Sequence, residues 1–113
     1  MEKRKFIKNI PFEEALVMKE LVTYEEGRVV SRTLVQRDNL TMTLFAFDKG
    51  EGISTHSAPG DAMVYILDGK VEISIGDNPK LLLEAGQTTV MPADIPHGLE
   101  AVENFKMLLI LVK

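Results

Sequence analysis

Turn-forming residues interrupt this chain at short intervals from Glu25 onward, and that feature limits its fold more than any other. Asp38-Asn39, Asp68-Gly69 and Gly76-Asp77-Asn78-Pro79 each separate short apolar or β-branched segments. Aspartate, asparagine, glycine and proline favour turns, and Asp-Gly between two strands indicates a tight hairpin. The spacing predicts roughly nine short antiparallel strands, and therefore an all-β fold that closes into a barrel or forms two packed sheets.

Alternation within these segments predicts which side chains lie inside. In Val71–Ile75 the valine and isoleucines share one face, whereas Leu40–Phe47 carries apolar residues on both faces and should be covered on both sides. The last segment, Phe105–Val112, is also apolar on both faces. Since a large exposed apolar patch is unusual for a monomer, we expect a homodimer.

The segment before Gly27 is the least regular part of the sequence. Phe6–Ile10 alternates weakly and predicts a short edge strand. Residues 11–22 have helix-favouring side chains, but the run from Ala15 to Met18 is equally compatible with a strand. We predict a short N-terminal strand here, followed by one helical turn near Lys19–Val22.

Composition excludes several classes of protein. A chain of 113 residues with 45% hydrophobic and 27% charged residues is expected to form one globular domain, residues 1–113. The net charge of −4, with scattered basic residues, argues against nucleic-acid binding. The absence of cysteine excludes disulfides, thiolate metal sites and cysteine nucleophiles. No apolar run resembles a secretory signal or reaches membrane-spanning length, so we expect a cytoplasmic protein.

The two histidines lie in similar surroundings. His56 follows the glycine turn at Gly50 and precedes a dense apolar strand that ends before Gly69. His97 follows a second glycine turn at Gly86 and a short segment ended by Pro92. These matching stretches predict that the two imidazoles meet inside a small barrel.

The first stretch, residues 50–69, resembles the first motif of the cupin family. That motif is glycine, five residues, His-x-His, three or four residues, glutamate, six residues and glycine. Gly50, His56 and Gly69 fit it. Ala58 replaces the second histidine and Ala62 replaces the glutamate.

The second stretch, residues 86–101, resembles the second cupin motif, which is glycine, five residues, Pro-x-Gly, two residues, histidine, three residues and asparagine. Gly86, Pro92 and His97 are in register. Asp94 replaces the glycine that follows the proline, and Ala101 replaces the asparagine.

The resemblance implies a double-stranded β-helix, or jelly-roll barrel, here with a short N-terminal strand and at most one helical turn. Cupin metal sites resemble a set of three histidines and one glutamate. Two of these four positions are alanine here, so His56 and His97 would hold a divalent iron, manganese, nickel or zinc ion only weakly, or none.

Four further residues are candidates for the same site. Asp61 becomes a third metal ligand if Pro59-Gly60 bends the strand enough to turn it inward; otherwise it is a turn residue or strand-end cap. Lys106 either supplies a cation for an anionic ligand or faces solvent at a strand end. Tyr65 and Met91 are candidate wall residues of the ligand site.

Three functions remain open. The leading hypothesis is a small-molecule binder that uses His56 and His97. The second is a metal-dependent oxygenase, isomerase or lyase of the cupin kind that uses the same histidines and Asp61. The third is a non-catalytic structural or sensory barrel, filled by its own side chains. Fold alone does not choose among them.

Overall fold

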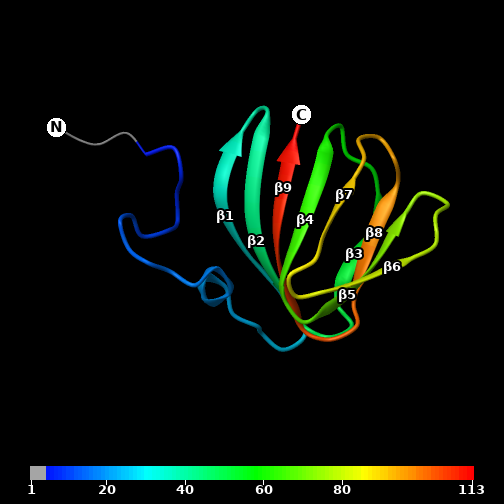
Figure 1. Cartoon of the computed structure of the whole chain (residues 1–113), viewed down its shortest axis with the longest axis horizontal. Coiled ribbons are helices and arrows are strands. Elements are labelled where there is room, and N and C mark those ends of the chain that lie inside the picture. The colour runs from blue at the N-terminus through cyan, green and yellow to red at the C-terminus, as the bar shows by residue number, and fades with distance from the viewer. Residues whose placement is uncertain (1–4) are drawn as a thin grey trace.

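The computed structural model of this chain describes residues 5–113 (Figure 1). Residues 1–4, part of the basic N-terminus in which no secretory signal is expected, lie outside the described residues. The described part contains one 3-10 turn, η1 (Met18–Leu21), and the strands β1 (Val29–Arg37), β2 (Leu40–Phe47), β3 (Gly52–His56), β4 (Asp61–Asp68), β5 (Lys70–Ile75), β6 (Leu81–Glu84), β7 (Thr88–Met91), β8 (His97–Ala101) and β9 (Phe105–Val112). Among these residues, no helix has the length and apolar character needed to cross a membrane.

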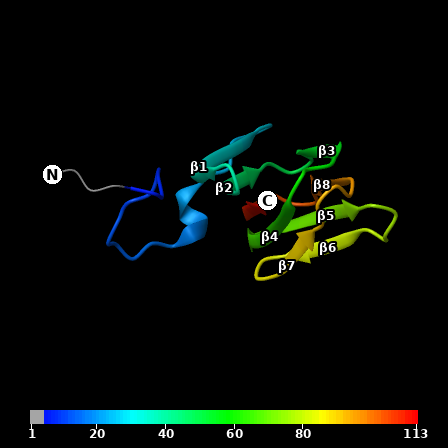
Figure 2. The ribbon, with the colours of Figure 1, turned by 90° about the horizontal axis from the view of Figure 1, so that it is seen from above.

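The strands form two antiparallel sheets (Figures 1 and 2). The five-stranded sheet has the order β1-β2-β9-β4-β7, and the four-stranded sheet has the order β3-β8-β5-β6. From β2 to β5, and again from β6 to β9, each successive strand belongs to the opposite sheet. This crossing between two sheets is the jelly-roll arrangement, so the all-β fold class predicted from the sequence is confirmed.

The Asp68-Gly69 pair does not form the hairpin that its sequence predicts. Gly69 alone links β4 to β5, and these strands lie in different sheets. Gly69 has a φ of 76°, and a Cβ at this position would collide with the carbonyl oxygen of Asn104. Glycine is therefore needed where the chain turns the corner between the sheets.

Apolar side chains pack on both faces of the five-stranded sheet. The interior cluster lies between the two sheets and includes Phe47 and Phe105, whose rings stack with centroids 4.6 Å apart. The outer cluster lies on the opposite face and includes Leu44 and Ala46 from the same strand β2. The prediction that Leu40–Phe47 is covered on both sides is confirmed, because Leu44, Ala46 and Phe47 are all 0% exposed.

The N-terminal segment contains no strand among its described residues, so the strands expected at Phe6–Ile10 and just before the helical turn near Lys19–Val22 are wrong. Asn9 and Glu13 have φ values of 60° and 63°, which are incompatible with an extended strand, and Pro11 between them lacks a backbone donor. The Lys8 amide still donates to the Leu34 carbonyl, 2.8 Å away, beside the edge strand β1. The expected helical turn is confirmed at Met18–Leu21.

Candidate functional site

The structure brings the two histidines together. His56 ends β3, His97 begins β8, and their Cα atoms are partners in the antiparallel register. The ring centroids lie 4.5 Å apart with the planes at 66°. His97 is 4% exposed, whereas His56 is exposed to solvent. His97 therefore lies deep in the barrel and His56 at its mouth.

The turn before His97 explains how its ring is positioned. Pro92 and Pro96 restrict the backbone on either side, and Asp94 has a φ of 64°, which aspartate tolerates better than most residues. The Asp94 amide donates to the Ala58 carbonyl, 2.8 Å away, which ties this turn to the segment after His56. Asp94 is thus a turn former, as its position between two prolines indicates.

Both imidazoles make the same local hydrogen bond. His56 Nδ1 lies 3.0 Å from the Ser54 carbonyl oxygen, and His97 Nδ1 lies 3.1 Å from the Ile95 carbonyl oxygen. A carbonyl oxygen only accepts, so each Nδ1 carries the hydrogen and donates it. In the neutral rings, each Nε2 is then an acceptor with a free lone pair.

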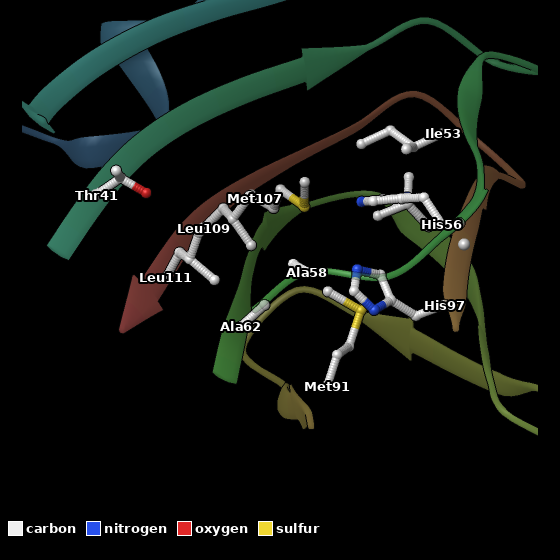
Figure 3. Close-up of a pocket in the computed structure, with 12 residues that line it drawn as sticks. Thr41, Ile53, His56, Ala58, Ala62, Met91, His97, Met107, Leu109 and Leu111 are labelled. Atoms are coloured by element: carbon white, nitrogen blue, oxygen red, sulfur yellow. The ribbon is translucent and has the colours of Figure 1, made fainter. Parts of the chain in front are cut away.

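A cavity of about 120 Å³ lies beside the two rings, between the sheets (Figure 3). Its lining is Thr41, Ile53, His56, Ala58, Ala62, Met91, His97, Gly98, Leu99, Met107, Leu109 and Leu111. Within the described part of the chain, no acidic or basic side chain other than the two histidines lines it. The cavity is therefore an apolar chamber in which the two imidazoles supply most of the polar chemistry.

The two alanines at cupin ligand positions both border this chamber. Ala62 points inward from β4 and is 3% exposed, and Ala58 lies in the segment after β3. Their methyl groups leave open the space that an imidazole and a carboxylate would fill. The chamber exists in part because these positions carry alanine.

Asp61 does not join the two histidines. Residues 61 and 62 pair regularly with Val112 and Leu111, so Asp61 points away from the interior that its neighbour Ala62 faces. Its Oδ1 accepts a hydrogen bond from the Ala93 amide at 2.9 Å. The chain bends at Pro59-Gly60, but this bend does not turn Asp61 inward as the third-ligand hypothesis required. Across residues 5–113, no group of three His, Cys, Asp or Glu side chains is placed to hold a metal ion.

Of the other candidates, only Met91 lines the chamber. Tyr65 is 42% exposed on the outer face of β4, because Val64 and Ile66 on either side of it point inward. Lys106 points outward from β9, and its Nζ donates to the Lys19 carbonyl at 2.7 Å. The interpretation of Tyr65 and Lys106 as ligand contacts does not agree with their positions.

Lys106 belongs instead to a cluster that holds the N-terminal segment. Its Nζ lies 4.8 Å from the centroid of the Tyr24 ring, and the Tyr24 hydroxyl donates to Asp68 Oδ2 at 2.6 Å. Burial raises the pKa of Tyr24 well above its usual value, and the hydrogen bond to Asp68 and the negative charge of that carboxylate raise it further.

This shift predicts a loss of stability at high pH. Because the pKa is raised in the folded state, the contribution is complete below the unfolded value of about 10 and is lost as the pH rises above it. Tyr24→Phe should cost about 1 kcal/mol at pH 7 and flatten the alkaline decline. Urea unfolding between about pH 7 and 11 measures both, with Tyr65→Phe as the control. An unchanged slope in Tyr24→Phe would contradict the assignment.

Comparison with known proteins places this architecture in a family. The cupin domain model matches residues 43–113, which contain both histidines. A conserved protein of unknown function from Streptococcus pyogenes is 49% identical, with 99% of this chain and 97% of that chain covered and a TM-score of 0.95. A cupin superfamily protein from Desulfitobacterium hafniense is 33% identical, with 94% and 96% covered and a TM-score of 0.89.

A cupin 2 conserved barrel domain protein from Leptotrichia buccalis is 49% identical, with 84% of this chain but 46% of that chain covered and a TM-score of 0.80. No curated protein matches this chain. The family model covers more than half of the sequence. The chain belongs to the cupin superfamily.

Proposed function

We propose that this small cupin binds a small, largely apolar molecule in the barrel chamber through His56 and His97. A hydroxyl group of the molecule donates its one hydrogen to Nε2 of His97 and lies beside His56. The observation that carries the proposal is that two imidazoles, each with its Nδ1 bonded to a backbone carbonyl, line a largely apolar cavity. Ligand sites of this kind combine apolar walls with a few polar groups that fix orientation.

Size and polarity define the ligand class. A dry cavity of about 150 Å³ accommodates benzene in a well-studied engineered protein, and this chamber measures about 120 Å³. Two neutral Nε2 acceptors favour a ligand that donates a hydrogen bond, because an acceptor group would leave both lone pairs unpaired in an apolar site. A small phenol or similar hydroxyl compound satisfies both conditions.

The divalent metal of the family does not fit this donor set. Structural zinc takes four protein ligands and catalytic zinc usually three, whereas two imidazoles are present here. A metal-dependent oxygenase, isomerase or lyase is a weaker alternative, because Asp61 is bound to the Ala93 amide. A barrel filled by its own side chains is also disfavoured by the chamber itself.

Titration with phenol tests the proposal. The chain has six methionines, and labelled methyl groups report the site by NMR. Met91 and Met107 line the chamber, while Met63 is exposed on the outer face of β4 and serves as an internal control. Phenol should shift the first two signals and bind at least about tenfold more tightly than toluene, which lacks the donor. Equal binding of toluene, or no binding of either, would contradict the proposal.

The expected homodimer stays a prediction. It is supported by exposed apolar side chains on the outer face of the five-stranded sheet, Met63 and Val90, and on the N-terminal segment, Phe12 and Val17. A second copy would remove these groups from water. Light scattering should then give twice the chain mass of 12.6 kDa, and Met63→Lys should shift the equilibrium toward the monomer. A monomer at high concentration would contradict the prediction.

A further inference from the structure

We propose that the chamber also binds a copper(I) ion, held by Nε2 of His56 and His97 and by the thioether sulfurs of Met91 and Met107. The inference uses the same two nitrogens as the proposed ligand site, but it does not depend on what organic molecule binds there.

The two methionines are buried side chains of the same cavity. Met91 is 3% exposed and Met107 is 0% exposed, and both line the chamber with the histidines. Figure 3 shows the side chains of Met91 and Met107 around the same cavity as the two imidazoles, with Met107 entering from β9. Met91 is the strand partner of Ala62, so a thioether lies next to the position where the cupin motif has a carboxylate.

The spacing of the two imidazoles is close to that of two ligands of one ion. With metal–nitrogen distances of about 2.0–2.1 Å, two imidazoles on a tetrahedral ion have ring centroids roughly 5 Å apart. The observed separation is 4.5 Å. Both Nδ1–H groups are fixed by backbone carbonyls, and such bonds orient ligating histidines and leave Nε2 for the metal.

The donor chemistry selects copper(I). Imidazole and thioether are ligands that suit this soft ion, whereas magnesium, calcium and manganese favour carboxylate oxygens, which are absent from the lining. The charge of the ion also favours copper(I) over a divalent ion. The cost of moving an ion into an apolar medium scales with the square of its charge, so a monovalent ion costs about a quarter as much as a divalent ion of similar size. Among residues 5–113, no anionic side chain lines this chamber to offset a second positive charge.

Binding needs no redox step and no proton release from neutral rings, because each Nε2 already has a free lone pair. One of these lone pairs also accepts the hydroxyl hydrogen of an organic ligand. Copper(I) and phenol should therefore exclude one another.

Anaerobic competition with a chromophoric copper(I) chelator tests the inference. The purified protein should bind one copper(I) per chain, at least about a hundredfold more tightly than zinc(II). The variant Met91→Leu/Met107→Leu keeps the side-chain volume, a change that cores tolerate well. It should bind copper(I) at least about tenfold more weakly. Met63→Leu, on the outer face, is the matched control and should bind copper(I) as the unmodified chain does.

Two results would overturn the inference: an unchanged copper(I) affinity in the double methionine variant, or zinc(II) bound as tightly as copper(I). Thermal unfolding of each variant verifies that it is folded. If phenol fails to bind the unmodified chain while copper(I) binding still depends on both methionines, the copper site stands and only the organic ligand class is wrong.

Discussion

His97→Ala should weaken phenol binding by roughly 30-fold, whereas His56→Ala should weaken it by about fivefold. His97 is 4% exposed and lines the largely apolar chamber. Removing it leaves the donor of the ligand unpaired, which costs about 2 kcal/mol. His56 is exposed at the mouth, so water can take its place and the loss is about 1 kcal/mol. Calorimetric titration measures both affinities.

The controls separate loss of the site from loss of the fold. Tyr65→Phe changes an exposed residue of β4 outside the chamber and should bind phenol normally. Circular dichroism and thermal unfolding show whether each histidine variant is folded. Normal phenol affinity in a folded His97→Ala protein would contradict the site assignment. A larger loss of phenol affinity in His56→Ala than in His97→Ala would contradict the conclusion that His97 lies deeper in the chamber.

Local alternation is enough to predict much of the barrel. Strand β2 alternates between the interior and the outer cluster as its sequence indicates, because side chains on a strand point to opposite faces in turn. The same rule predicts that Met107 points inward, because it shares one face of β9 with Phe105 and Leu109. It also predicts that Tyr65 points outward if Ala62 faces the interior, because the two residues are three positions apart on the strand.

The failures lie where the outcome depends on distant parts of the chain. Asp68-Gly69 has the local preference of a hairpin, but the carbonyl of Asn104 packs against Gly69 where the chain passes between sheets. The sequence neighbours of Lys106 do not reveal its contact with Tyr24, which arrives from the N-terminal segment. An inward Asp61 requires a bend before it, but the regular pairing of β4 with β9 holds this side chain outside.

The meeting of the two histidines is predictable for a different reason. The glycines and prolines of both cupin-like motifs set where strands begin and end, and this determines the register in which His56 opposes His97. The side chains that surround the histidines are harder to predict. The pairing of Met91 with Ala62 joins residues from two strands that are separated along the chain. The position of Met91 next to Ala62 follows from that register and from no local pattern.

Ala58→His combined with Ala62→Glu should convert the chamber into a divalent metal site. Both alanines line the cavity with the two imidazoles. The double variant supplies the histidine and the glutamate that the cupin metal motif has at these positions. Zinc affinity should rise at least about a thousandfold, or roughly 4 kcal/mol, as the site gains two protein ligands. Cobalt(II) absorption and metal analysis of the purified variant measure this gain.

The metal-free form of this variant should be less stable than the unmodified chain. An ionised carboxylate at position 62 would be buried among apolar side chains without a partner, which costs several kcal/mol, and each kcal/mol lowers Tm by roughly 4 °C. Zinc should restore the loss, because the ion binds the folded state and neutralises the carboxylate. Ala58→His with Ala62→Gln is the matched control, with a smaller penalty and a weaker gain from zinc. If the introduced carboxylate neither destabilises the metal-free protein nor binds zinc, position 62 does not face the imidazoles, and the geometry of the chamber is wrong.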